Sequence, residues 1–153
     1  MKHPSLEEEL QRLWDSLAAR WDVQKHEYWW PLRAGTAPPS VVAFHEDYFD
    51  DTKVSAGRKI LVAHSVDRVW ELREFGEWGC EQAVEAFKPA SNGEEGYFTS
   101  SGFGWVVSAS PESSITLAGD WLVEGFRELF PDFEQFSYEG PMSTPDRRGS
   151  WKF

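Results

Sequence analysis

Residues 104–118 contain two short runs in which apolar and more polar side chains alternate. The apolar positions are Trp105, Val107, Ala109, Ile115 and Leu117. A period of two is typical of β-strands, in which successive side chains point to opposite faces. Proline at position 111, between serines 110 and 113, favours a tight turn. We therefore expect a β-hairpin with one face in the core and the other toward solvent.

The hairpin is followed by an apolar stripe at helical spacing. Its members are Leu122, Phe126, Leu129 and Phe133. Asp120 is a candidate N-cap, because its side chain can accept hydrogen bonds from the first free amides of a helix. Pro131 lacks an amide hydrogen and predicts that the helix ends near Phe130. The pattern predicts an amphipathic helix over residues 120–130.

The N-terminal residues give the clearest helical pattern in the chain. Ser5 and Glu8 match a capping box, in which each side chain accepts a hydrogen bond from the backbone amide of the other residue. Apolar residues then recur at helical spacing: Leu6, Leu10, Leu13, Trp14, Leu17, Ala18 and Trp21. We expect this helix to pack on the sheet; the alternative is a helix that binds a partner.

The middle of the chain predicts three further strands and several loops. Strands are expected at residues 41–44, 68–75 and 96–101. Residues 54–64 fit either a helix capped by Ser55 or a buried strand, and we favour the helix. The apolar segment 82–87 is left unassigned. Residues 25–40 and 89–96 are expected to be loops, and 45–51 an acidic loop.

These elements predict an α+β fold. We expect an antiparallel sheet of about four to five strands, with the N-terminal and C-terminal amphipathic helices packed on it. Residues 1–139 are assigned to a single domain. Residues 140–153 are rich in Pro, Ser and Gly with a basic balance, and we expect a mobile C-terminal tail. Trp151 and Phe153 leave open that this tail folds back on the acidic domain.

Composition indicates a bulky aromatic core. The chain of 153 residues has nine Trp and eleven Phe, and a buried aromatic hides about 150–250 Å² of surface. Nine tryptophans are more than one core readily covers, so one or two are expected to stay partly exposed. The single cysteine, Cys80, excludes an internal disulfide. The absence of a signal-like or membrane-spanning apolar run leads us to expect a cytoplasmic protein.

The net charge of −11 limits the classes of partner. Binding nucleic acid or anionic membranes requires many basic groups that neutralise phosphates. The charge therefore argues against both. It permits a basic protein partner, although solubility alone also explains an acidic surface.

No motif identifies a reaction. The four histidines form no metal-binding pair, and neither a nucleophile elbow nor a phosphate-binding loop is present. Cys80 lies beside Glu77 and Glu81, whose negative charges disfavour a thiolate and make it a poor candidate nucleophile. Gly102-Phe103-Gly104 lacks the third glycine of a dinucleotide fingerprint. We expect no cofactor and no metal.

Several residues are nevertheless candidates for contact with other molecules. His45 with Asp47, Asp50 and Asp51 could form a dispersed catalytic site, but a solvated acidic loop is the simpler interpretation. Glu71 and Arg73 share one strand face and could bind a polar ligand or form an ion pair. The candidate partner-binding residues are Trp29, Trp30, Asp47, Asp50, Asp51, Glu71, Arg73, Glu94 and Glu95.

The segment 104–119 followed by an amphipathic helix resembles a pattern in uncharacterised small bacterial α+β proteins. The segments around Trp29-Pro31-Leu32-Arg33 and Trp70-Glu71-Leu72-Arg73 are similar to earlier parts of that pattern. In general appearance the chain also resembles immunity proteins of bacterial toxin systems, which are small, acidic and α+β. This resemblance implies a protein partner and transfers no catalytic residue.

Three hypotheses follow. The first is a non-enzymatic interaction protein that occludes a basic partner, such as a toxin nuclease, with acidic residues around exposed aromatics. The second is a small-ligand or carbohydrate-binding module that stacks its ligand on Trp29, Trp30 or Trp105. The third is a hydrolase with a dispersed His and carboxylate site. We favour the first.

Overall fold

The computed structural model of the chain describes residues 6–23, 41–74, 79–111 and 113–136. Its helices are α1 (Leu6–Trp21), α2 (Asp51–Ala63) and α3 (Asp120–Leu129). Its strands are β1 (Val41–His45), β2 (Arg68–Arg73), β3 (Gly79–Ala83), β4 (Gly96–Thr99), β5 (Val106–Ser110) and β6 (Ser114–Ala118). Short 3-10 helices are η2 (Glu46–Tyr48), η3 (Val84–Ala86) and η4 (Phe133–Phe136).

The strands form one antiparallel sheet in the order β1-β6-β5-β4-β2-β3. The α+β class is confirmed, but the described sheet has six strands rather than four or five. The unexpected strand is β3, which pairs Glu81 with Trp70 and Cys80 with Glu71. Its sequence, GCEQA, lacks the β-branched and aromatic residues that identify strands. Pairing with β2 therefore determines its conformation more than local preference does.

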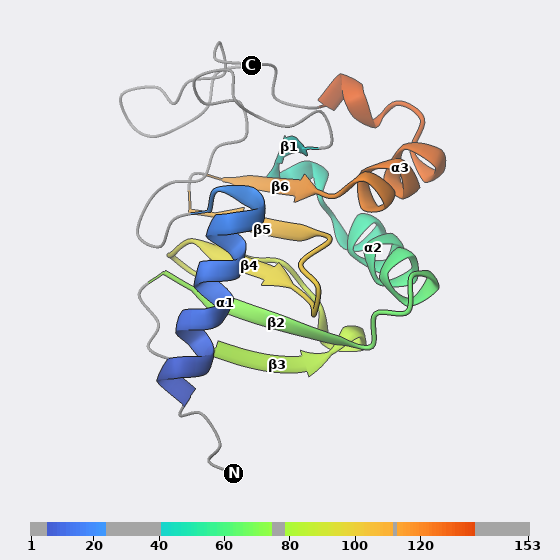
Figure 1. Cartoon of the computed structure of the whole chain (residues 1–153). Coiled ribbons are helices and arrows are strands. Elements are labelled where there is room, and N and C mark those ends of the chain that lie inside the picture. Colours follow the sequence, from blue (N-terminus) through green and yellow to red (C-terminus); the bar gives the residue numbers. More distant parts are fainter. Residues whose placement is uncertain (1–5, 24–40, 75–78, 112, 137–153) are drawn as a thin grey trace.

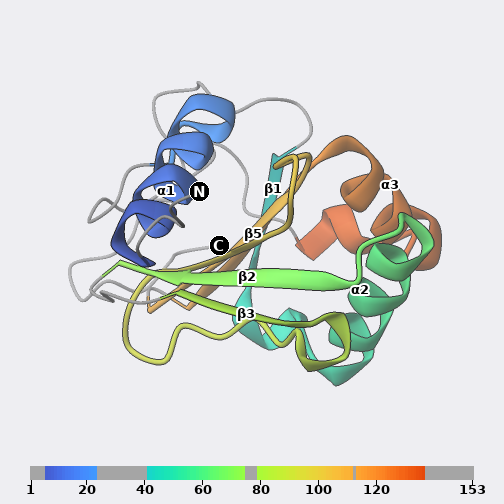
Figure 2. The same cartoon turned by 60° about the horizontal axis from the view of Figure 1, so that its bottom comes forward.

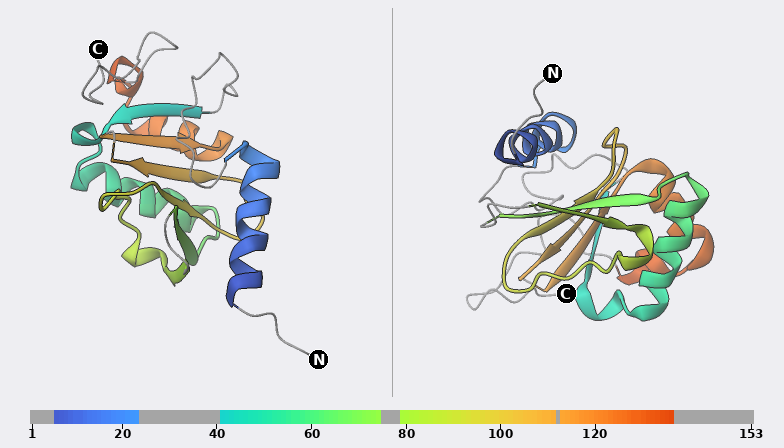
Figure 3. Two further views of the ribbon diagram at one scale, coloured as in Figure 1. Left: turned by 90° about the vertical axis from the view of Figure 1, so that its left-hand side faces the viewer. Right: turned by 90° about the horizontal axis from the view of Figure 1, so that it is seen from below.

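The sheet is covered on both faces. Helix α1 crosses one face, and α2 and α3 lie against the other (Figures 1 and 2). The view from below separates the three layers, with α1 on one side of the strands and the α2–α3 pair on the opposite side (Figure 3). The predicted packing of the N-terminal and C-terminal helices on the sheet is confirmed.

Each face has its own hydrophobic core. On the α1 face, Leu17 and Trp14 pack with Leu72 and Tyr97 of the sheet, and Trp14 meets the Tyr97 ring edge-on at 5.5 Å. On the other face the core is larger and more aromatic. Its members include Phe44, Phe49, Phe87, Phe98, Trp105, Phe126 and Phe133. Burial of large aromatic rings on this second face is the main apolar contribution to the fold.

The expectation that one face of the hairpin meets solvent is wrong. Every residue of β5 and β6 is buried, including Ser108 and Thr116 on the α1 face. These two residues pair across the strands, and Ser108 also pairs with Tyr97. The period-two pattern correctly predicted the strands, but polar residues at alternate positions do not by themselves show that a face is solvated.

The described helices lie where they were predicted, but two predicted caps are wrong. The favoured helix over 54–64 is confirmed as α2 with bounds Asp51–Ala63, and Asp50 rather than Ser55 caps it by accepting a hydrogen bond from the Lys53 amide at 3.1 Å. Gly119, not Asp120, is the N-cap of α3. Its φ is +124°, and an added Cβ would lie 2.8 Å from the Gly104 carbonyl oxygen, so glycine is needed there.

The prediction for the C-terminal end of α3 is also confirmed only in part. The helix ends at Leu129 with Phe130 as its C-cap, before Pro131, as expected. Leu122 and Phe126 are buried, but Leu129 is 54% exposed and does not belong to the core stripe. Ser5, the aromatic residues 28–30 and the tail 140–153 lie outside the described residues. Within the described part, no helix has the length and apolar character needed to span a membrane.

Helices α2 and α3 pack closely because each carries a glycine where they meet. A Cβ at Gly57 would lie 3.2 Å from the tip of the Phe126 ring. A Cβ at Gly125 would lie 3.0–3.1 Å from three side-chain carbons of Ile60. The two helices therefore pack closely against each other and together cover the aromatic core.

The packing of α1 can be tested by truncating a buried leucine. Leu17 is fully buried, so Leu17→Ala should lower the free energy of unfolding by about 2–5 kcal/mol. Leu129→Ala, a matched change at an exposed leucine, should change it by less than about 0.5 kcal/mol. Urea denaturation followed by circular dichroism measures both. Equal effects would contradict the packing of α1 on the sheet.

Candidate functional site

Two hollows lie at opposite ends of the α2–α3 pair. At one end, His64 after α2 stacks on Trp121 at the start of α3, with ring centres 4.2 Å apart. At the other end, Asp51 at the start of α2 and Leu129 at the end of α3 line the same hollow. The two helices thus run antiparallel, and each hollow is built from both of them.

The first site contains three of the candidate acidic residues. Asp47 lies in η2, Asp50 caps α2 and Asp51 is the first residue of α2; all three are exposed. We call Glu46, Asp47, Asp50, Asp51 and Asp132 the acidic corner. The expectation of an acidic loop over 45–51 is wrong for most of this segment: His45 ends β1, residues 46–48 form η2 and Asp51 begins α2. The Asp47 amide donates to His45 Nδ1, and the Asp50 cap fixes the start of α2.

Tyr48 connects the acidic corner with the end of α3. Burial raises the pKa of the phenol above its usual value, and the negative charges of Asp132 and Asp50 raise it further. The Lys53 ammonium lies 4.5 Å from the Tyr48 ring centre and 5.2 Å from that of Phe130. The same ammonium lies 3.6 Å from a carboxylate oxygen of Asp50. This lysine therefore joins the two segments of the corner.

An apolar hollow of about 490 Å³ lies directly beside the acidic corner. The lining residues are Asp51, Thr52, Ser55, Ala56, Lys59, Leu129 and Phe130. Leu129 is one of two large hydrophobic side chains that are exposed in the described part of the chain. The surface thus combines the apolar side chains of Ala56, Leu129 and Phe130 with the carboxylate of Asp51, which belongs to the acidic corner.

Glu71 and Arg73 form an interior ion pair rather than part of an exposed surface. The Arg73 guanidinium lies 2.8 Å from Glu71 Oε2, donates to the Ser91 carbonyl at 2.8 Å and covers the Phe98 ring. Arg73 is only 6% exposed. Gly96 leaves the space for it, because a Cβ at that position would overlap the guanidinium. The pair links β2 to the loop before β4.

The remaining candidate residues are also separate from the acidic corner. Glu95 is buried; it accepts a hydrogen bond from Ser110 Oγ at 2.8 Å, and its amide donates to Glu74 Oε1 at 2.9 Å. Its neighbour Glu94 is partly buried. Trp29 and Trp30 lie outside the described residues. Of the nine candidates, Asp47, Asp50 and Asp51 lie in the acidic corner, whereas Glu71 and Arg73 pair with each other in the interior.

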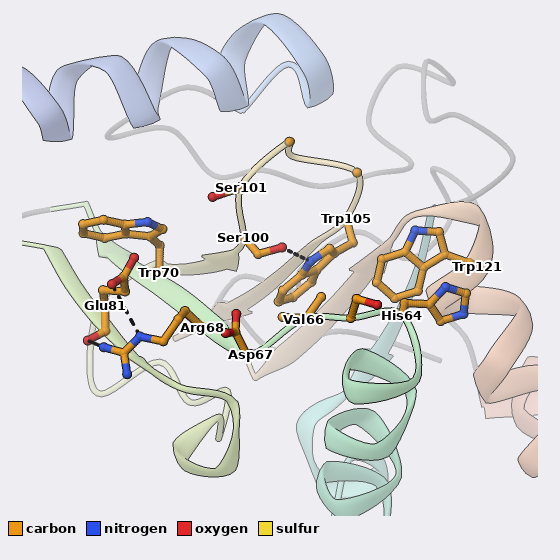
Figure 4. Close-up of a pocket in the computed structure, with 13 residues that line it drawn as sticks. His64, Val66, Asp67, Arg68, Trp70, Glu81, Ser100, Ser101, Trp105 and Trp121 are labelled. Atoms are coloured by element: carbon orange, nitrogen blue, oxygen red, sulfur yellow. Dashed lines mark hydrogen bonds and ion pairs between the residues drawn. The ribbon is translucent and has the colours of Figure 1, made fainter.

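The second site is a cleft of about 430 Å³ at the end of the sheet nearest His64. It is bounded by residues 64–67 before β2, by the loop 100–104 between β4 and β5, and by the start of α3. Trp70, Trp105 and Trp121 all line it, with Trp105 between the other two in Figure 4. We call it the tryptophan cleft.

Hydrogen bonds fix the wall formed by the loop 100–104. Thr99 Oγ1 donates to the Trp105 carbonyl at 2.6 Å, and the Trp105 indole N–H donates to Ser100 Oγ at 2.7 Å. Trp105 itself is 1% exposed. The residue that was expected to be a stacking platform is therefore a core side chain, and only its edge reaches the cleft. Trp70 and Trp121 are partly exposed, as expected for one or two tryptophans.

Charged groups along the cleft are close to balanced. Arg68 Nε lies 3.4 Å from Glu81 Oε1, and its Nη2 donates to the Glu81 carbonyl at 3.3 Å. Asp67 is exposed and lines the same cleft as Ser100 and Ser101 (Figure 4). The cleft thus offers carboxylates, a guanidinium and serine hydroxyls beside the indoles.

Sequence reasoning missed the tryptophan cleft because its residues are far apart in the chain. His64 and Trp121 meet only through the helix pair, and residues 65–67 meet the loop 100–104 only because β2 pairs with β4. An antiparallel pairing of the predicted strands 68–75 and 96–101 would have placed those loops at the same end of the sheet. Trp70, Trp121 and Asp67 would then have been candidates.

The described residues include no group of three His, Cys, Asp or Glu side chains that could hold a metal ion. The comparisons add no assignment: no protein family, curated protein or solved structure significantly matches this chain. Function must therefore be inferred from the two surfaces themselves.

The interior role of Arg73 gives a direct prediction. Arg73→Ala leaves the mostly buried Glu71 carboxylate without a cation, with the Gln82 amide still donating to it at 3.4 Å, and should destabilise the protein by about 3 kcal/mol. Arg68→Ala removes an ion pair whose side chains are both more than 40% exposed, and should cost less than about 1 kcal/mol. Chemical denaturation of both variants measures the difference. Similar costs would contradict an interior role.

Proposed function

We propose that this protein is a non-enzymatic interaction protein that binds a basic protein partner at the acidic corner and the adjacent apolar hollow. The observation that carries the proposal is the hollow that exposed Leu129 lines together with Asp51, a member of the acidic corner. The immunity-type role expected from the sequence is the narrower form of this proposal, in which the basic partner is a toxin.

The layout of this surface supports protein binding. Stable interfaces usually have an apolar centre, which supplies most of the affinity, and a polar rim, which excludes water and selects the partner. Here the hollow beside Leu129 and Phe130 would accept an apolar anchor of the partner. Asp47, Asp50 and Asp51 would face basic side chains around that anchor.

The charge of the corner supports a basic rather than a neutral partner. Lys53 pairs with Asp50, and Lys59 lines the hollow, so two cations stand against five carboxylates within this surface. An excess of negative charge speeds association with a basic protein and repels acidic ones. A partner bound here would be occluded without chemical change.

The test uses affinity capture from the native host at physiological ionic strength. The bait is wild type, the corner variant Asp47→Asn/Asp51→Asn, or Leu129→Ala. We expect wild type to retain a basic protein that both other baits lose. With the purified partner, the corner variant should associate about tenfold more slowly at low salt, and Leu129→Ala should dissociate faster.

The matched control is Glu7→Gln/Asp15→Asn, which removes the same two charges from exposed positions of α1, on the other face of the sheet. This variant should retain the partner as wild type does. Capture of no basic protein would overturn the proposal. Equal loss in the two double variants would also overturn it, because net charge alone would then explain binding.

A further inference from the structure

We propose that the tryptophan cleft is a second binding site, for an uncharged saccharide. This inference does not depend on the protein-binding function, since the cleft lies at the opposite end of the α2–α3 pair from the acidic corner. The cleft volume of about 430 Å³ is within the range of about 300–1,000 Å³ typical of small-molecule sites.

The indole rings suit the apolar faces of sugar rings. Trp70 and Trp121 are partly exposed and lie toward opposite ends of the cleft, with the edge of Trp105 between them (Figure 4). His64 stacks nearly parallel on one face of Trp121, with 17° between the rings. The imidazole thereby fixes the orientation of that indole. A flat, rigid aromatic wall loses little conformational entropy when a ligand packs against it.

The polar groups around the indoles match a ligand with many hydroxyls. The Asp67 carboxylate accepts hydrogen bonds, the Arg68 guanidinium donates them, and the serine hydroxyls of the 100–101 loop can do both. Ser100 already accepts from the Trp105 indole, so its own hydroxyl hydrogen remains available to a ligand oxygen. A sugar presents donors and acceptors on adjacent carbons, which is the pattern that these side chains can pair.

The balance of charge disfavours phosphorylated ligands. Arg68 is paired with Glu81, and Asp67 adds a second carboxylate to the cleft. A phosphate would meet these carboxylates without an excess of cations to neutralise it. The site therefore lacks the basic groups that nucleotides and sugar phosphates require, whereas an uncharged sugar needs no counter-charge.

The experiment titrates ¹⁵N-labelled protein and follows the indole N–H resonances, assigned through the variants Trp70→Phe and Trp121→Phe. The probes are glucose, galactose, mannose, N-acetylglucosamine and their common disaccharides, each up to about 10 mM. We expect at least one probe to shift the Trp70 and Trp121 resonances saturably. Glucose 6-phosphate, adenosine monophosphate, adenosine and uridine should shift neither.

The contribution of the cleft is tested with two carboxamide variants. Asp67→Asn should weaken binding of the active probe about tenfold or more, because it replaces a charged acceptor. Asp47→Asn, the same change in the acidic corner, should leave binding within about twofold. Both residues are exposed, so both variants should fold. No response to any sugar, a nucleoside or phosphate response instead, or equal affinity of the two variants would overturn the inference.

Discussion

Close packing of α2 on α3 is the constraint on which both surfaces depend. Gly57 meets Phe126, and Gly125 meets Ile60, at distances that leave no room for an added methyl group without movement of the partner. Glycine in a helix interior costs about 1 kcal/mol relative to alanine, so these two positions are unfavourable locally. The contact energy across the helix pair must offset that cost.

The aromatic core determines where the helix pair lies on the sheet. Phe87 meets both Phe98 and Trp105 edge-on, and Phe126 packs on Phe49, so the rings of the sheet and helices interlock. With the helices held in this way, His64 is placed against Trp121 at one end and Leu129 is placed beside Asp51 at the other. Helix α1 covers the opposite face and contributes to neither hollow.

The sequence predicted what short-range periodicity determines. Alternation at residues 105–117 identified the hairpin, and the stripe through Leu122 and Phe126 identified α3. It did not predict features that depend on the assembled sheet. Ser108 and Thr116 are buried because a second layer covers their face, and β3 forms because it pairs with β2.

Among the candidate residues, Asp47, Asp50 and Asp51 lie close together in the sequence, and they were correctly expected to be exposed. The burial of Arg73 and Glu95 depends instead on distant strands and loops.

The substitution Gly125→Ala tests the helix contact most directly, through the sign of its effect on the free energy of unfolding. In an exposed helix, alanine would stabilise by up to about 1 kcal/mol. The contact with Ile60 predicts instead a loss of about 1–3 kcal/mol in urea denaturation, partly relieved when Gly125→Ala is combined with Ile60→Val. A Gly125→Ala protein more stable than wild type would contradict close packing of α2 and α3, and with it the account of how both hollows are formed.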